Sequence, residues 1–176
     1  MTYVFVREPL GREEADRLAN ACNTFLEKLV IWTLLDTGLR VGELCGLRRQ
    51  DVQWQENRLV IWGKGGRFGT RGKRRVVPLT ERARRLLEIH FITSDCIGLD
   101  IRTAQRLVKR VADRAVITKT VTPHVLRHTF AVNCVQRGVS TASLRRILGH
   151  DRLETTEIYL NLSPEQAIQE FREKVR

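Results

Sequence analysis

The segment 23–36 limits the fold most, because too many of its positions are apolar for a helix that lies on a protein surface. Large apolar side chains fill most of it, among them Phe25, Leu26, Leu29, Val30, Trp32, Leu34 and Leu35. Such dense coverage predicts a helix that is buried on most sides, and Thr37-Gly38 ends it. Other elements must therefore surround this helix. The chain has 176 residues, 42% of them hydrophobic, which is enough for one domain with a real core.

The rest of the pattern is mostly helical, with one small β region. Two β-rich runs, Arg58–Trp62 and 75–79, are joined by a glycine-rich basic stretch, and we expect Trp54 in a third strand just before them. Apolar stripes and capping signals predict helices over 13–22, 41–47, 83–90, 101–115, 122–138, 140–149 and 163–175. The predicted fold is mainly α with a small antiparallel β-sheet (α+β).

The net charge indicates a polyanionic partner. Lys and Arg number 31 against 20 for Asp and Glu, which gives a formal net charge of +11 and a pI of about 10.4. In so short a chain this excess is typical of nucleic-acid binding, although ribosomal and membrane-surface proteins share it. No apolar run approaches the roughly 20 residues of a membrane span. The first twenty residues show no signal-peptide pattern, so we expect a cytoplasmic, membrane-free protein.

Metal and nucleotide sites are not indicated. The aspartates at 51, 95, 100 and 151 are scattered, which argues against a two-metal nuclease, and Gly63-Lys-Gly-Gly lacks the spacing of a P-loop. We expect no cofactor.

The cysteines form no C-x-x-C pair and lie near no histidine at zinc-ligand spacing. The four cysteines are Cys22, Cys45, Cys96 and Cys134. We expect all four to be reduced thiols, and we expect the three that lie in helical patterns to be buried.

Residues with a shared chemistry lie at the breaks of the helical pattern: Arg40, Lys64, His124, Arg127, His150 and Tyr159. Displacement at a phosphodiester without metal builds negative charge on the non-bridging oxygens, which two forked guanidiniums fit bidentately. Imidazoles can bind the phosphate or move a proton near neutral pH. A tyrosine can attack, and a lysine can protonate the leaving oxygen. The set supplies each role, although each residue taken alone is typical of ordinary surface or core positions.

Three ordered motifs resemble those of the tyrosine recombinases, the phage integrase family. Thr37-Gly-Leu-Arg-Val-Gly-Glu-Leu-Cys-Gly-Leu47 resembles the first-arginine motif, and Pro123-His-Val-Leu-Arg-His-Thr-Phe-Ala131 resembles the H-x-x-R box. Leu148-Gly-His-Asp…Thr155-Thr-Glu-Ile-Tyr159 resembles the terminal histidine–tyrosine motif. The likeness is strongest to Xer-type recombinases. It implies the catalytic-domain fold of that family over residues 13–162.

The resemblance implies how the phosphate would be bound and attacked. Arg40 and Arg127 would clamp the scissile phosphate. Tyr159 would attack it and leave a 3′-phosphotyrosyl bond with a free 5′-hydroxyl. Glu43 matches an acidic position that supports the active site. Because the phosphotyrosyl bond conserves energy, neither ATP nor a metal would be required.

Proton transfers fall, by the same resemblance, to the remaining residues. His124 would help accept the tyrosine proton, His150 would hydrogen-bond the phosphate, and Lys64 would protonate the 5′ oxygen. The stretch after Lys64 is longer than the usual Xer-like hairpin turn, which makes Lys73 the alternative general acid. The cations of this stretch either contact DNA backbone phosphates or belong to a solvated loop: Arg67, Arg71, Lys73 and Arg74.

The resemblance also implies an organisation and partners. Family members usually carry an N-terminal core-binding domain, and residues 1–12 correspond to the connector after it, in a truncated or a minimal form. Residues 163–176 correspond to a C-terminal helix that docks in trans on a neighbouring subunit or in cis. Double-stranded DNA and self-association on it, as a tetrameric synapse, are the expected partners. The implied function is site-specific recombination or integration. The alternatives are a type IB topoisomerase-like nicking–closing activity and a DNA-binding module without catalysis.

Overall fold

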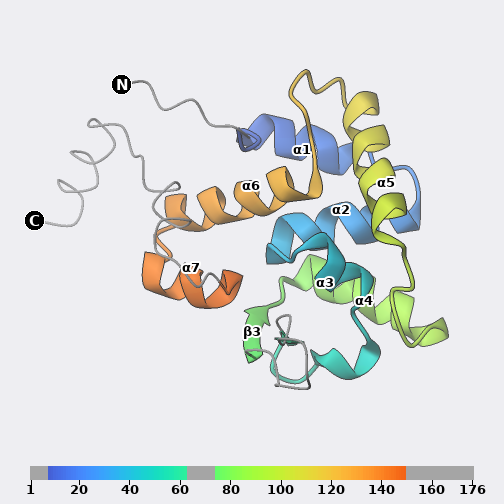
Figure 1. The fold of residues 1–176 in the computed structure, drawn as a ribbon, viewed down its shortest axis with the longest axis vertical. Helices are drawn as coiled ribbons and strands as arrows, with labels where there is room; N and C mark the ends of the chain where they lie inside the picture. Colours follow the sequence, from blue (N-terminus) through green and yellow to red (C-terminus); the bar gives the residue numbers. More distant parts are fainter. Residues whose placement is uncertain (1–7, 63–73, 150–176) are drawn as a thin grey trace, which may run out of the picture.

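The computed structural model describes residues 8–62 and 74–149, and these ranges are mostly helical (Figure 1). The helices are α1 Arg12–Asn20, α2 Phe25–Thr37, α3 Val41–Cys45, α4 Glu81–Thr93, α5 Ile101–Arg114, α6 Pro123–Gln136 and α7 Thr141–Leu148. A 3-10 turn covers Arg49–Asp51, and the strands are β1 Val52–Gln53, β2 Arg58–Trp62 and β3 Arg74–Pro78. The strands form one antiparallel sheet in the order β1-β2-β3. The predicted mainly α fold with a small antiparallel sheet is confirmed.

Helix α2 forms the centre of the core. Thr24 caps it by accepting a hydrogen bond from the Glu27 N–H, and the Glu27 carboxylate accepts one from the Thr24 N–H. Leu29, Ile31 and Leu34 are fully buried, because α1, α4, α5 and α6 all pack against this helix. The predicted burial of this segment is confirmed, although the helix begins at Phe25, whose side chain is still exposed.

The C-terminal end of α2 depends on a glycine. Gly38 has a left-handed backbone (φ 62°), and its N–H donates to the Leu34 carbonyl. A Cβ at this position would collide with the ring of Phe130 on α6 and lie 3.0 Å from Leu148 of α7. Glycine therefore lets α6 and α7 close on the end of α2. The same turn brings Leu39 into the core and points the chain toward α3.

The sheet alternates as expected for a surface sheet on a helical core. Leu59, Ile61 and Val77 are buried, whereas Val76 and Arg74 are exposed. Strand β3 lies beside α7, which in turn packs on α6 (Figure 1). This contact brings the beginning of β3 to the C-terminal end of α7.

Four expectations about local structure need correction. Trp54 lies in the turn after β1, because the chain reverses there through Asn57, which has φ 51°. Its ring instead packs edge-on against Phe91. Helix α1 ends at Asn20, two residues before Cys22, and α3 ends at Cys45, because the chain turns at Gly46. Among the cysteines expected to be buried, Cys45 and Cys134 are only half-buried.

The remaining expectations concern the thiols, membrane-spanning helices and the two ends of the chain. Cys22 is buried, which raises the pKa of its thiol to about 11, and Cys96 is exposed; all four thiols are free. No helix within the described ranges is long and apolar enough to cross a membrane. The predicted helix over 163–175 lies outside the described residues, as do residues 1–7 of the expected connector.

Candidate active site

Arg40 lies at the start of α3, immediately after the turn that ends α2. Its backbone is extended (φ −69°, ψ 147°), and about half of its side chain is exposed. The Arg40 N–H donates to Glu43 Oε2 at 2.7 Å, and Nη1 donates to Glu43 Oε1 at 2.9 Å. Nη2 donates to the Gly149 carbonyl at 3.4 Å. The guanidinium is thus held on a carboxylate at one side and on the end of α7 at the other.

Arg127 lies on α6, and its residue is only 3% exposed. Nη1 donates to the Gly38 carbonyl at 2.6 Å, and Nη2 donates to the Leu148 carbonyl at 2.7 Å. These two acceptors stand directly beside Arg40 and its acceptor: Gly38 is two residues before Arg40, and Leu148 precedes Gly149. Folding therefore brings the guanidiniums of Arg40 and Arg127 to one place.

Arg75 completes the cluster and was not among the residues expected from the sequence. Its Nη1 and Nη2 donate to the two carboxylate oxygens of Glu43, both at 2.7 Å, and its Nε donates to the Ile147 carbonyl at 2.9 Å. The sequence did contain a sign of this role, in the alternation of buried and exposed residues along β3. Arg75 shares a face with the buried Val77, and an arginine on the buried face of a strand requires a partner.

Glu43 is the anion at the centre of this cluster, and its side chain is 13% exposed. Burial by itself raises the pKa of the Glu43 carboxyl, but hydrogen bonds from Arg75 and from the Arg40 N–H, with the Arg75 charge, lower that pKa to about 2. Each carboxylate oxygen accepts one hydrogen bond from each arginine. Glu43 therefore stays ionised and fixes both side chains.

The chemistry of the described cluster suits an oxyanion. The cluster holds three guanidiniums and one carboxylate, which Arg40 and Arg75 bind, so positive charge exceeds negative charge. Forked N–H donors fit phosphate oxygens. Within the described residues, no group of three or more His, Cys, Asp or Glu could hold a metal ion.

Comparison with known proteins identifies the family. The model of the phage integrase family matches residues 8–166. The chain belongs to the phage integrase family. It is 32% identical over 157 residues to the tyrosine recombinase XerA of Saccharolobus solfataricus, a match that covers 87% of this chain and 52% of that protein. The chain thus spans about half the length of this curated relative.

Solved structures share the fold of this integrase-family chain. A crystal structure of XerA recombinase matches with a TM-score of 0.82 and 29% identity, over 100% of this chain and 66% of that one. The Tn1549 transposon integrase, solved in complex with transposon right end DNA, matches with a TM-score of 0.76 and 21% identity, over 98% and 68%. The fold is that of a Xer-like tyrosine recombinase catalytic domain, as the sequence motifs predicted.

His124 occupies the first turn of α6 in this integrase-family domain, where Thr122 caps the helix and Pro123 is its first residue. Its ring is paired with that of His128, one turn further on, with the two Nε2 atoms 2.9 Å apart. At this distance one ring nitrogen donates and the other accepts, with the roles set by the tautomers of the two imidazoles. His128 was missed from the sequence, although its spacing of four residues places it on the same helix face.

The remaining expected site residues divide into two groups. Arg74 is exposed on β3, on the face opposite to Arg75. The others lie outside the described residues: Lys64, Arg67, Arg71, Lys73, His150 and Tyr159. Residues 63–73 join β2 to β3, and residue 150 follows the Gly149 cap of α7. Both segments therefore connect to elements that the cluster of Arg40, Arg75 and Arg127 holds.

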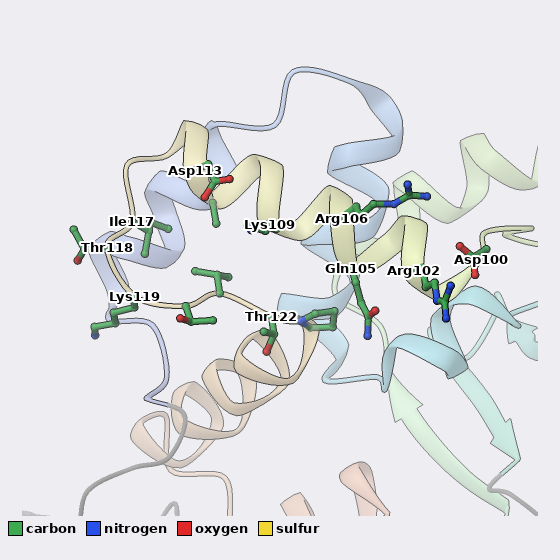
Figure 2. Close-up of a pocket in the computed structure, with 14 residues that line it drawn as sticks. Asp100, Arg102, Gln105, Arg106, Lys109, Asp113, Ile117, Thr118, Lys119 and Thr122 are labelled. Atoms are coloured by element: carbon green, nitrogen blue, oxygen red, sulfur yellow. The ribbon is translucent and has the colours of Figure 1, made fainter.

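A hollow of about 880 Å³ lies between α5 and the loop that leads to α6 (Figure 2). Helix α5 lines it with polar side chains that were not among the expected site residues: Arg102, Gln105, Arg106 and Lys109, with Asp100 and Asp113 toward its two ends. Pro123, which precedes His124, also lines it. The hollow thus extends a basic surface to the helix that carries His124 and Arg127.

The low pKa of Glu43 predicts a pH-dependent contribution to stability. Because the folded-state pKa lies near 2 and the ordinary value is 4.5, the contribution is fully present above pH 4.5 and is lost as the pH falls toward 2. Urea unfolding should give a stability difference between wild type and Glu43→Gln of roughly 3 kcal/mol at pH 6 that shrinks below pH 4.5.

Glu81→Gln is the matched control, because its carboxylate pairs with Arg85 on an exposed surface. This variant should differ little from wild type at any pH. A Glu43→Gln difference that stays constant from pH 6 to pH 3 would contradict the ionised, arginine-held carboxylate.

Proposed function

We propose that this domain cuts and rejoins DNA in site-specific recombination, through a 3′-phosphotyrosyl intermediate and without a metal ion. The pairing of Arg40 and Arg127 on the consecutive carbonyls of Gly149 and Leu148 carries this proposal. His150 is the next residue, and Tyr159 follows nine positions later in the sequence. Two oxyanion-binding groups thus meet where the chain enters the segment with the proposed nucleophile.

Arg40 and Arg127 bind the non-bridging oxygens of the scissile phosphate in this proposal. A guanidinium has five N–H donors in a planar fork, so one that is anchored on carbonyl oxygens can also bind a phosphate. The anchors hold the donors in place before DNA arrives. Donors fixed in this way stabilise the charge that builds up in the transition state without reorganising, which is the usual source of a large rate effect.

Tyr159 is the proposed nucleophile. Its oxygen bonds to phosphorus while the bond from phosphorus to the 5′ oxygen breaks, which leaves a 3′-phosphotyrosine and a 5′-hydroxyl. A phenol has a pKa of about 10 and needs a proton acceptor. His124 helps to accept that proton, and His150 hydrogen-bonds the phosphate. Attack by a 5′-hydroxyl from another strand reverses the step and releases the tyrosine, so no ATP is consumed.

Lys64 is the proposed general acid for the 5′ oxygen, with Lys73 as the alternative. Both lie in the segment 63–73, and the ends of this segment support the assignment. Trp62 and Arg74 pair across β2 and β3, and the next residue, Arg75, binds Glu43 at the cluster. The described residues on either side of the segment are therefore next to the strand residue that reaches the cluster.

Double-stranded DNA is the proposed partner, bound mainly through its phosphates. The exposed Arg74 and the basic lining of the hollow on α5 lie on the elements that flank the cluster. The loop residues Arg67, Arg71 and Lys73 add contacts to the DNA backbone in this proposal. The complex of the Tn1549 integrase with DNA supports the same partner. Such binding should weaken markedly as salt concentration rises.

Self-association on DNA belongs to the same proposal, with two sites exchanged in a tetrameric synapse. Residues 163–176 are the proposed docking helix, in trans between subunits or in cis. A type IB topoisomerase-like activity would use the same chemistry on a single duplex. Strand exchange between two labelled duplexes supports recombination, whereas relaxation of supercoiled DNA without exchange supports the topoisomerase alternative.

Covalent trapping tests the nucleophile. A pool of nicked duplexes with randomised sequence removes the need to know the target site. Cleavage a short distance to the 5′ side of a nick releases the fragment that carries the 5′-hydroxyl, so the strand cannot be rejoined and the adduct persists. Wild type should form a protein–DNA adduct that resists denaturant, and Tyr159→Phe should form none, because the ring remains and the attacking oxygen is gone.

Tyr3→Phe is the matched control, since Tyr3 is the only other tyrosine of the chain, and it should form the adduct as wild type does. An adduct that persists in Tyr159→Phe would refute the nucleophile. The absence of any adduct in wild type, with DNA binding intact, would favour a binding module without catalysis.

A 5′-phosphorothiolate substrate identifies the general acid. Sulfur leaves without protonation, so this substrate should restore cleavage to the variant that lacks the true acid. We expect Lys64→Ala to be slow on the oxygen substrate and near wild type on the sulfur substrate, whereas Lys73→Ala should gain nothing from the change. Rescue of Lys73→Ala alone would assign the role to Lys73.

A further inference from the structure

Arg75 joins three elements of the candidate active site. It starts from β3, binds Glu43 on α3 with two hydrogen bonds of 2.7 Å, and donates through Nε to the Ile147 carbonyl of α7 at 2.9 Å. Its side chain is only 8% exposed. The guanidinium uses both its fork and its Nε inside the protein, which is the pattern of a residue that holds other groups in place.

The contact with Glu43 extends to Arg40. Glu43 Oε1 accepts from Nη1 of both arginines, and Oε2 accepts from Nη2 of Arg75 and from the Arg40 N–H. Arg40 is half-exposed, so solvent would let its side chain move among several rotamers if Glu43 did not hold it. Glu43 can keep the Arg40 side chain in a single rotamer because Arg75 fixes the Glu43 carboxylate from the other side.

The contact of Arg75 with α7 fixes the backbone carbonyl that Arg40 binds. Gly149 has a left-handed backbone, and a Cβ on it would lie 2.7 Å from Cδ of Arg75. The aliphatic part of Arg75 therefore packs directly against the Gly149 cap, whose carbonyl accepts from Arg40. One side chain thus sets both the carboxylate and the backbone that position Arg40.

We propose that Arg75 is a positioning residue for DNA cleavage: it aligns Glu43 with the C-terminal end of α7, and so holds the Arg40 guanidinium in the orientation that binds the scissile phosphate. This role rests on the proposed strand cleavage by Tyr159. Arg75 does not touch the phosphate, so its loss affects the rate of the covalent step and leaves DNA affinity in place. In the sequence, β3 follows segment 63–73, which contains the proposed general acid, and α7 precedes the segment that contains Tyr159. Arg75 links these two elements, since it starts from β3 and binds the Ile147 carbonyl of α7.

The chain contains a matched pair for comparison. Arg114 binds both carboxylate oxygens of Glu27 at 2.9 and 3.1 Å and also donates to the Ala21 carbonyl. Hydrogen bonds from Arg114 lower the pKa of Glu27 to about 2, as in Glu43. This pair lies near the N-terminus of α2, roughly 16 Å along the helix from Gly38 at 1.5 Å per residue. It offers the same chemistry without a connection to the cluster.

The test measures single-turnover adduct formation on a nicked duplex selected by wild type, together with the dissociation constant for that duplex. We expect Arg75→Gln to lower the adduct rate at saturating DNA on the order of 100-fold, the effect of a displaced catalytic group, with the dissociation constant within about threefold of wild type. Arg75→Lys should be nearly as slow, because an ammonium cannot bind a carboxylate bidentately and reach a carbonyl. Arg114→Gln should cleave at the wild-type rate.

A double-mutant cycle separates a positioning role from a loss of stability, because destabilisation alone would not make the effects of Arg75 and Glu43 on the cleavage rate depend on each other. If Arg75 acts through Glu43, the Arg75→Gln/Glu43→Gln double variant should be no slower than the slower single variant. Thermal unfolding identifies the fraction folded, and Arg75→Lys serves if Arg75→Gln does not fold. A saturated rate for both Arg75 variants equal to that of Arg114→Gln would overturn the positioning role. A wild type without a Tyr159-dependent adduct would overturn the proposed function itself.

Discussion

Three consecutive carbonyl oxygens at the end of α7 accept hydrogen bonds from three arginines of three different elements. Ile147 binds Arg75 of β3, Leu148 binds Arg127 of α6, and Gly149 binds Arg40 before α3. A helix C-terminus leaves its last carbonyls without helical partners and carries partial negative charge, so cations are favoured there. This one helix end collects residues that lie more than a hundred positions apart in sequence, and the geometry of the candidate active site depends on it.

The three arginines have different surroundings, which fits different tasks. Arg75 is buried and binds a carboxylate and a carbonyl, Arg127 is buried and binds two carbonyls, and Arg40 is half-exposed. Glu43 provides the anion that lets guanidiniums lie this close together. The excess positive charge suits a phosphate. Gly38 matters as much as any charged residue, because only a residue without Cβ lets α6 and α7 reach the turn before Arg40.

The sequence predicted those features that depend on local pattern. The burial of α2, the capped start of α6 at Thr122 and the antiparallel pairing of β2 and β3 follow from periodicity and turn residues. Arg75 was missed because its importance comes from Glu43, 32 positions away, and a strand pattern shows that a face is buried without showing what lies across it. The exact end of α1 and the turn at Trp54 depend on tertiary packing, which local propensity does not encode. The family motifs selected Arg40 and Arg127 as candidates, yet the carbonyls that hold them are backbone atoms, which the residue types in a sequence do not reveal.

The central claim is that the guanidiniums of Arg40 and Arg127 form one site for a tetrahedral oxyanion. A crystal soaked with tungstate tests this most directly, because tungsten scatters anomalously and its position needs no assumption about the DNA sequence. We predict a tungstate within hydrogen-bonding distance of both guanidiniums. Tungstate bound elsewhere on the basic surface, with none shared by positions 40 and 127, would contradict it.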